Sequence, residues 1–486
     1  MNEVLNGLQP EAIWKYFAEI LQIPRPSKKE EKIIAYLIDF AKKHQLEYKQ
    51  DEVGNVLIKG KAKPGFENRK TVVLQSHVDM VCEKNSDTEH DFEKDPIEVF
   101  IEDGWVKAKG TTLGADDGIG VAAALALLVA DDVEHGPIEC LFTIDEETGL
   151  TGAFGLKAGF LEGKILLNLD SEDEGELFIG CAGGKDTVIE LPYQMQKAES
   201  GLRFYRLDVK GLKGGHSGDD IQKGLANANK LITRILWRAT HDFDLRINYL
   251  EAGNLRNAIA REGYAIVAIP EAKANDFSAF VEKSKVEMAY EYEVTEPNLN
   301  ITLAATDLKK ELMVAADQHK LLNSLYACPH GVIAWSQRIP DFVETSTNLA
   351  AVRMNAGIAL ITTSQRSSVE SAKEDIAQMV AACFDMTGAK VSHSNGYPGW
   401  APNPKSEIRA ITEASYKDLF NEQPDVKAIH AGLECGLIGD KYPGMDMISF
   451  GPTIKGAHSP DERLNIETVD KFWKLTLEVL KRIPVK

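Results

Sequence analysis

Four apolar segments of this chain end abruptly, three of them at an acidic residue or a histidine and the fourth at Gly451-Pro452, shortly before His458. Continuous apolar runs of this kind, separated by helical stretches, are typical of strands buried in a parallel sheet. In an open α/β sheet the ligand site lies at the carboxyl ends of the strands. We therefore expect these segments to deliver their polar residues to one edge of one sheet. The segments are 71–76, followed by His77; 138–144, followed by 145–147; 165–169, followed by Asp170; and 445–450, followed by a loop with His458.

Helices and short strands are expected around these runs. Apolar residues at helical spacing predict helices over 12–21, 28–43 and 119–128. Two β-rich runs, 46–49 and 55–58, predict short strands. The expected fold class is therefore α/β, with a central and mostly parallel sheet.

The length of 486 residues is too great for one hydrophobic core, so we expect two domains. The segment 187–400 differs in character and predicts an inserted α+β domain. Its first part has the order βαββαβ, which is the ferredoxin-like arrangement, and a second, less complete round of the same order follows. Residues 1–186 and 401–486 would then form one discontinuous domain, and the insert would consist of two related halves. The predicted elements of the insert are strand 203–210, helix 221–239, strands 244–250 and 263–270, helix 275–290, strand 298–304, helix 316–327, strands 344–353 and 357–363, helix 369–385 and strand 389–393.

The charge balance limits the classes of partner. Acidic residues outnumber basic ones by 74 to 55, for a net charge of -19, which argues against nucleic acid because phosphate binding needs a basic surface. The N-terminus lacks a secretory signal, and the most apolar segment, 121–130, is about half the length of a membrane span. Six scattered cysteines without a C-x-x-C pair fit reduced thiols. We expect a cytoplasmic protein that binds neither membrane nor nucleic acid.

Two of the polar groups stand at a strand end and at a helix start. In His77-Val78-Asp79, alternate residues of an extended chain point the same way, so an imidazole and a carboxylate can face one site. The alternative is a capped strand end. Asp116 and Asp117 stand between glycines before a helix, where an isolated Asp would be an N-cap. The flanking glycines, however, leave room for a metal, and one carboxylate can bridge two ions.

Three further groups follow the other strands. Asp145, Glu146 and Glu147 are adjacent acids, which repel one another unless a cation compensates; a solvated surface run is the alternative. Asp170 begins another acidic cluster, and His458 would by itself be an exposed loop histidine. Together the set contains imidazole and carboxylate donors without thiolate. That inventory suits two divalent ions, with zinc first and cobalt or manganese as alternatives.

The motifs resemble the aminoacylase/carboxypeptidase/carnosinase family of di-zinc exopeptidases, and most closely its aminoacyl-histidine dipeptidase branch. The matches span nearly the whole chain in the family's order. The resemblance implies a catalytic metal-binding domain with an inserted lid domain. The motifs are SHVDM (76–80), TTLGADDGIG (111–120), DEETGL (145–150), NLDSEDEGE (168–176), GLKGGHSGDD (211–220), GNLRNAIAREG (253–263), HAGLECGL (430–437) and GPTIKGAHSPDE (451–462).

The resemblance also implies a role for each metal-site residue. One ion would be held by His77 and Asp170, the other by Glu147 and His458, with Asp116 bridging them. Asp79 would orient His77, and Glu146 would be the general base. The resemblance further implies a cis peptide bond between residues 116 and 117.

Four residues outside the metal set are implicated in the same way. His216 would correspond to the lid histidine that helps to bind the tetrahedral oxyanion; an ordinary loop histidine is the alternative. Asn257 and Arg366 are candidates to hold the substrate carboxylate, Arg366 by a bidentate pair. Glu434 would receive a free α-amine or line the metal site.

The leading functional hypothesis is metal-dependent hydrolysis of unblocked dipeptides, including carnosine-like substrates with histidine in the second position. An N-acyl amino acid deacylase or carboxypeptidase with the same metal chemistry is an alternative. A catalytically silent peptide-binding homologue is another, against which the intact ligand set argues. Family analogy favours a homodimer, and His216 would act either in its own subunit or across the dimer.

Overall fold

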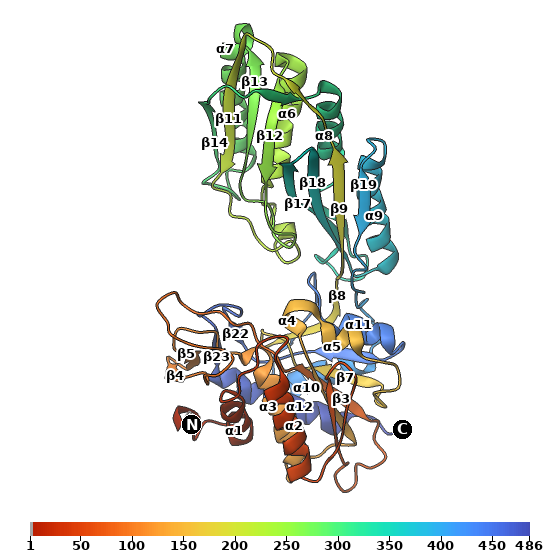
Figure 1. Cartoon of the computed structure of the whole chain (residues 1–486). Helices are drawn as coiled ribbons and strands as arrows, with labels where there is room; N and C mark the ends of the chain where they lie inside the picture. The colour runs from red at the N-terminus through yellow and green to blue at the C-terminus, as the bar shows by residue number, and fades with distance from the viewer. Residues whose placement is uncertain (1–2) are drawn as a thin grey trace. The chain divides into compact units, whose positions relative to one another are not determined.

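A computed structural model describes residues 3–486, which fold into two compact units (Figure 1). Within the described residues, the first unit comprises 3–180, Pro402–Ala428 and Leu433–Lys486, and the second comprises Cys181–Ala401 and Ile429–Gly432. The boundary expected between 186 and 187 thus lies at 180/181, because strand β9 (Gly183–Pro192) pairs with strands of the second unit. No helix within residues 3–486 is both long and apolar enough to cross a membrane.

The first unit is built on an eight-stranded sheet with the order β1-β2-β6-β3-β7-β21-β8-β20. Its four central strands, β6, β3, β7 and β21, are mutually parallel, and antiparallel strands flank them. These four are the apolar runs identified in the sequence, so the expected α/β class is confirmed. The strands are β1 (Glu47–Gln50), β2 (Val56–Gly60), β3 (Val72–His77), β6 (Ile138–Thr143), β7 (Ile165–Asn168), β8 (Glu176–Cys181), β20 (Asp425–Ile429) and β21 (Asp446–Ser449).

Helix α3 (Ala115–Val129) is the central helix of this unit. It packs on β3 and on α1, and it is buried from Ala115 to Leu128. This burial explains why the segment 121–130 is so apolar. The helix starts four residues earlier than predicted, with non-helical backbone at Asp116 and Asp117. The other helices are α1 (Glu11–Ile20), α2 (Glu31–Lys43), α4 (Glu146–Gly149), α5 (Thr151–Gly155), α10 (Glu407–Phe420), α11 (Glu434–Lys441) and α12 (Ile466–Arg482).

A small second sheet in this unit has the order β22-β23-β5-β4. Strands β22 (Ile454–Lys455) and β23 (Arg463–Asn465) are antiparallel, and the loop that joins them contains His458. Strand β23 also pairs with β5 (Trp105–Ala108), which pairs with β4 (Val99–Glu102). The sheet therefore anchors both ends of the His458 loop.

The second unit contains two copies of one arrangement. In the first half, β11, α6, β12, β13, α7 and β14 form a sheet with the order β14-β11-β13-β12. In the second half, β9, α8, β17, β18, α9 and β19 form the order β19-β9-β18-β17. Both are βαββαβ units with the ferredoxin-like strand order. The bounds in the first half are β11 (Leu202–Lys210), α6 (Ala228–Phe243), β12 (Arg246–Ala252), β13 (Gly263–Pro270), α7 (Ala274–Glu291) and β14 (Asn300–Ala305).

The second half takes its first strand, β9, from before the first half, which the sequence interpretation missed. The halves join edge to edge where β12 pairs antiparallel with β17. The predicted helix 221–239 was also wrong at its start, because residues 221–223 form a separate 3-10 turn. The bounds are α8 (Ala315–Ala327), β17 (Val343–Asn355), β18 (Ile358–Ser367), α9 (Glu370–Asp385) and β19 (Lys390–His393), with short strands β10 (Met195–Lys197), β15 (Glu311–Met313) and β16 (Gly331–Trp335) beside them.

Candidate metal centre

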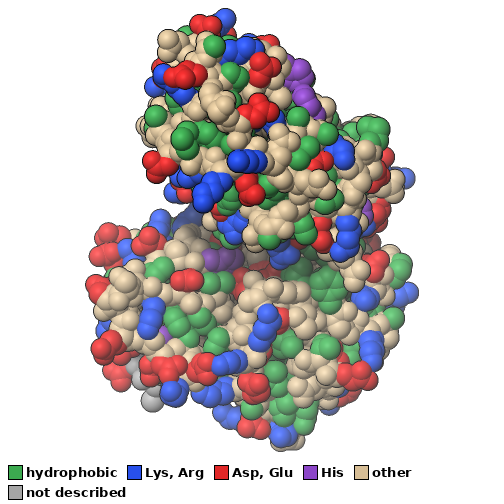
Figure 2. Space-filling view, turned by 45° about the horizontal axis from the view of Figure 1, so that its top comes forward, with side chains coloured by type: hydrophobic (Ala, Val, Ile, Leu, Met, Phe, Trp, Pro, Cys, Tyr) green, Lys and Arg blue, Asp and Glu red, His purple; other side chains and the backbone are tan. Residues whose placement is uncertain are grey.

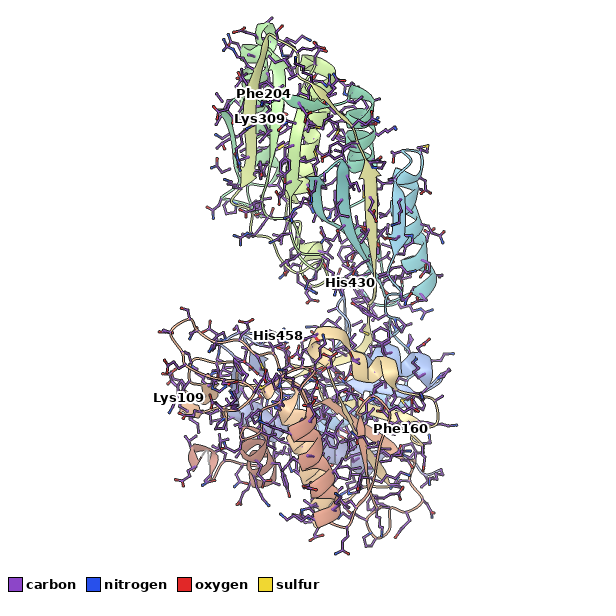
Figure 3. The ribbon with its side chains drawn as sticks, in the orientation of Figure 1. Lys109, Phe160, Phe204, Lys309, His430 and His458 are labelled. Atoms are coloured by element: carbon purple, nitrogen blue, oxygen red, sulfur yellow. The ribbon has the colours of Figure 1, made fainter. Side chains whose placement is uncertain are left out.

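The ends of the central strands in the first unit bring five predicted ligands together around Asp116. Its Oδ1 lies 3.0 Å from Nε2 of His77, and its Oδ2 lies 3.1 Å from Nε2 of His458. The same nitrogen of His77 is 3.3 Å from Oδ1 of Asp170, and that of His458 is 3.0 Å from Oε2 of Glu147. The site therefore consists of two three-residue groups that share one carboxylate. The position of His458 in the first unit can be found in Figure 3, where this residue is labelled.

The backbone around Asp116 is held by a residue that the sequence interpretation did not single out. Glu462 is buried, and its carboxylate accepts hydrogen bonds from four successive backbone N–H groups, residues 113–116, at 2.7 to 3.3 Å. The peptide bond between Asp116 and Asp117 is cis, as the resemblance implies. Glu462 lies four residues after His458. One loop therefore supplies one candidate metal ligand, His458, and positions a second, Asp116. Glu462 is the last residue of the motif GPTIKGAHSPDE.

A tight turn after β6 presents Glu146 and Glu147. Asp145 has a positive φ of 48°, and its carboxylate accepts hydrogen bonds from the hydroxyls of Thr148 and Thr151. Such a φ is uncommon outside glycine and best tolerated by Asp or Asn, which explains an Asp at this reversal. The turn places two adjacent glutamates at the start of α4.

Asp79 connects this turn to His77. Its Oδ1 lies 3.4 Å from Nδ1 of His77 and accepts a hydrogen bond of 3.0 Å from the backbone N–H of Glu146. Its Oδ2 accepts from the backbone N–H of Glu147 and from the hydroxyl of Ser27. A carboxylate on the second nitrogen of a ligating imidazole orients the ring and increases its basicity.

Glu434 lies behind the strand ends, fully buried. Its Oε2 accepts hydrogen bonds of 2.6 Å from Gln75 on β3 and Thr143 on β6, and Oε1 has no hydrogen-bond partner within residues 3–486. Burial raises the pKa of Glu434 to about 7. The side chain thus adds a further buried carboxyl group that contacts β3, which ends at His77, and β6, which leads to Glu146.

The site contains more carboxylates than positively charged side chains. Burial raises the pKa of Asp170 to about 7, and burial with the charge of Asp116 raises that of Glu172 to about 8. Although burial alone lowers the pKa of His77, the charges of Asp170 and Asp116 outweigh it and raise that pKa well above its usual range. Hydrogen bonds with Asp116 and Glu147 raise the pKa of His458 to about 11. Protons or metal cations must balance this negative charge.

These shifts predict how the metal-free protein responds to pH. Because the folded pKa of His458 is raised above its unfolded value of about 6.5, its stabilising effect is complete below pH 6.5 and is lost as pH rises towards 11. We expect the thermal midpoint of the chelated protein to fall between pH 7 and 9. In His458→Ala the thermal midpoint should fall less between pH 7 and 9 than in the wild type. Metal binds the deprotonated imidazole, so metal-loaded protein should also show a smaller change of thermal midpoint with pH. An equal change with and without metal would contradict the raised pKa of His458. Thermal unfolding followed by circular dichroism measures both.

The other predicted residues lie in the second unit, where they also come together. His216 follows β11, and its strand-like bridge to Ala258 puts it beside Asn257, whose backbone carbonyl accepts a hydrogen bond from Ser217. Nε2 of His216 and Nη2 of Arg366 lie 3.4 Å apart. The backbone N–H of Asp219 donates to Nδ1 of His216.

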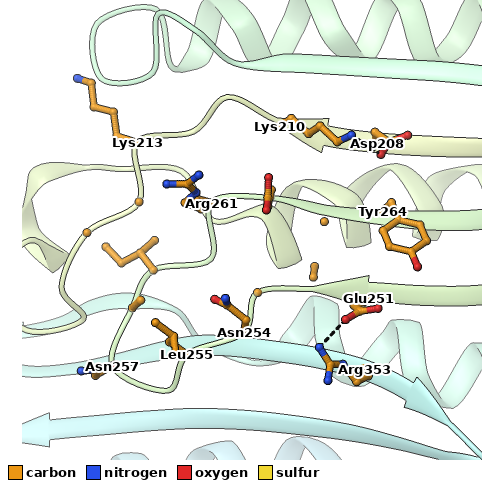
Figure 4. A pocket seen from close by; sticks show the side chains of 18 of the residues that line it. Asp208, Lys210, Lys213, Glu251, Asn254, Leu255, Asn257, Arg261, Tyr264 and Arg353 are labelled. Atoms are coloured by element: carbon orange, nitrogen blue, oxygen red, sulfur yellow. Dashed lines mark ion pairs between the residues drawn. The ribbon is translucent and has the colours of Figure 1, made fainter. Parts of the chain in front are cut away.

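An open cavity of about 890 Å³ borders His216 and Asn257 (Figure 4). It extends over the face of β11, β12 and β13, where several charged side chains pair with one another. Arg206 makes two hydrogen bonds to Asp208, and Arg353 pairs with Glu251. On the face visible in Figure 2 acidic and basic side chains are likewise interspersed.

Comparisons with known proteins identify similar sequences and structures. The chain is 44% identical to the cytosol non-specific dipeptidase of Escherichia coli (strain K12) over 482 residues, which cover 99% of each protein. It superposes on the aminoacylhistidine dipeptidase of Vibrio alginolyticus with a TM-score of 0.93 and 43% identity, each chain being covered completely. A Staphylococcus aureus tripeptidase shares the fold at 16% identity and a TM-score of 0.57, with 98% and 99% coverage.

The resemblance inferred from the motifs is thereby confirmed. Residues 73–482, which include the candidate metal ligands and the residues around His216, match one family of peptidases. Together with the full-length relatives, this match places the chain in the peptidase family M20/M25/M40.

Proposed function

We propose that this protein is a metal-dependent dipeptidase that hydrolyses unblocked dipeptides. The observation that carries the proposal is the position of Asp116, whose two oxygens face two separate pairs of an imidazole and a carboxylate. His77 and Asp170 would hold one divalent ion, and Glu147 and His458 the other. The substrate class is supported by the full-length relatives, whose names describe dipeptidases.

Two divalent ions bound by these residues would polarise the scissile carbonyl and lower the pKa of a water molecule. Glu146 is the proposed general base. Burial and the neighbouring carboxylates of Asp170 and Glu147 raise its pKa well above its usual range, which suits a base that must also return its proton. Glu146 takes a proton as the water oxygen bonds to the carbonyl carbon. It returns a proton to the leaving amine as the C–N bond breaks.

The second unit, expected over 187–400, is proposed to act as the lid. His216 would donate a hydrogen bond to the oxyanion, and Asn257 and Arg366 would bind the substrate carboxylate. Glu434 is proposed to receive a free α-amine through its buried carboxyl group, or to line the metal site. Zinc is the proposed ion because nitrogen and oxygen donors without thiolate suit it, with cobalt or manganese as substitutes. The name of the Escherichia coli relative supports a cytoplasmic location, and the homodimer stays a prediction.

A substrate panel with defined metal content tests the proposal. We expect metal-loaded protein to release free amino acids from unblocked dipeptides, including Xaa-His dipeptides, and to leave N-acetylated dipeptides intact. Chelation should abolish turnover, and zinc, cobalt or manganese should restore it. Faster cleavage of N-acyl amino acids would favour the deacylase alternative. Activity that survives complete metal removal would reject the proposal.

A further inference from the structure

A tyrosine that the motifs did not include contacts Arg366 in the second unit. The Nη1 group of Arg366 donates a hydrogen bond of 3.0 Å to the hydroxyl of Tyr397. The arginine side chain lies at the end of β18 and is only 7% exposed, so its guanidinium is held in a largely buried position. On the other side of the guanidinium, Nη2 lies 3.4 Å from His216.

The position of the Tyr397 ring is set by two glycines from distant parts of the chain. A Cβ atom at Gly184 would lie 2.7 Å from the ring atoms Cε1 and Cζ, and one at Gly432 would lie 2.9 Å from Cε2. Neither distance is possible for a real side chain, so the ring occupies a slot that only glycine leaves open. The backbone of Tyr397 exchanges two hydrogen bonds with Gly184, and the buried Lys373 donates to its carbonyl oxygen. The hydroxyl is therefore held firmly.

The hydrogen bond to Tyr397 determines which donors Arg366 has left. Tyr397 engages one of the two N–H groups of Nη1, on the side away from Nε, whereas Nε and Nη2 present their N–H groups along one edge of the planar guanidinium. The Nε group is buried and has no acceptor within residues 3–486. A buried N–H without an acceptor is costly, and two N–H groups on one edge match the two oxygens of a carboxylate.

We propose that Tyr397 is a positioning residue that orients Arg366 so that its Nε–Nη2 edge is presented to the C-terminal carboxylate of the substrate. Tyr397 acts through Arg366 and selects substrates that end in a free carboxylate. The inference rests on the proposed dipeptidase function and extends it.

The test compares Tyr397→Phe with the wild type on a dipeptide and on the same dipeptide with a C-terminal amide. The phenylalanine ring fits between the two glycines, so only the hydroxyl is lost. We expect KM for the dipeptide to rise about 10-fold with kcat nearly unchanged, because a hydrogen bond to a charged group is lost. KM for the amide, which lacks the carboxylate, should change less than 2-fold. In an Arg366→Lys background, Tyr397→Phe should have no further effect.

Two more variants separate positioning from a general loss of structure. Gly432 has no positive φ, so Gly432→Ala is tolerated by the backbone but displaces the ring, and it should reproduce the substrate-dependent rise in KM. Tyr416→Phe also removes a hydroxyl hydrogen bond, to Glu174 in the first unit, and should leave both substrates unaffected. Equal losses on dipeptide and amide, or unchanged KM in Tyr397→Phe, would overturn the inference. A wild type that cleaves no dipeptide would instead reject the proposed function.

Discussion

Replacing Glu146 by Gln is expected to lower dipeptide turnover by about 10²- to 10⁴-fold while two metal ions remain bound. Gln keeps the shape of the side chain but cannot accept a proton from water at neutral pH. The two groups that surround Asp116 do not need Glu146, because His77, Asp170, Glu147 and His458 complete them. Steady-state kinetics with elemental analysis of the same sample makes the measurement.

The neighbouring glutamate provides the contrast. Oε2 of Glu147 lies 3.0 Å from Nε2 of His458, and the Glu147 side chain is only 4% exposed, as expected of a ligand. Glu147→Gln should therefore lose bound metal together with turnover. If Glu146→Gln also loses metal, or keeps full activity, its assignment as the general base is wrong.

Replacing Glu462 by Gln is expected to weaken metal binding by about 10- to 100-fold, although Glu462 is not itself a proposed ligand. The Glu462 carboxylate accepts hydrogen bonds from four backbone N–H groups next to Asp116. The side-chain amide of Gln would place its own N–H groups opposite some of the four backbone N–H groups. Each buried N–H that is left unpaired costs about 1–3 kcal/mol. The segment should shift, and Asp116 with it. Titration with zinc against a competing chelator measures the affinity.

Glu139 offers a matched control in the same unit. It is buried, and its Oε2 accepts hydrogen bonds from two backbone N–H groups, of Glu162 and Gly163, near the opposite end of β6 from Glu146. Glu139→Gln should lower the thermal midpoint but leave zinc affinity unchanged. Wild-type affinity in Glu462→Gln, or an equal loss in Glu139→Gln, would contradict a specific role of Glu462 at the metal site.

Much of the first unit could be predicted because its chemistry coincides with its strand ends. A buried parallel strand is recognisable as an apolar run, and the carboxyl ends of such strands meet at one edge. His77, Glu147 and Asp170 could therefore be grouped from the amino-acid sequence alone. The second unit was harder. Strand β9 begins with Gly183 and Gly184, which hide its alternating pattern, so the completeness of the second half went unnoticed.

Glu462 and Tyr397, which hold other residues in place across long sequence separations, were not predictable from local patterns. Glu462 has no periodicity or motif of its own that assigns it four backbone partners, and Tyr397 was missed because its slot is formed by Gly184 and Gly432. Such roles depend on contacts between segments far apart in the chain.

The amino-acid sequence by itself determined the α/β class, the identity of the residues that follow the central strands, and the choice of imidazole and carboxylate donors. These are local properties, because hydrophobic periodicity and side-chain chemistry are carried by short segments. The resemblance implied that Asp116 lies between His77 and His458, and only the tertiary structure decided the distances of its two oxygens from them. Only the tertiary structure, too, decided that Glu462 holds the backbone of the Asp116 segment and that Tyr397 reaches Arg366. Distances between side chains depend on how distant segments pack, which no local pattern records.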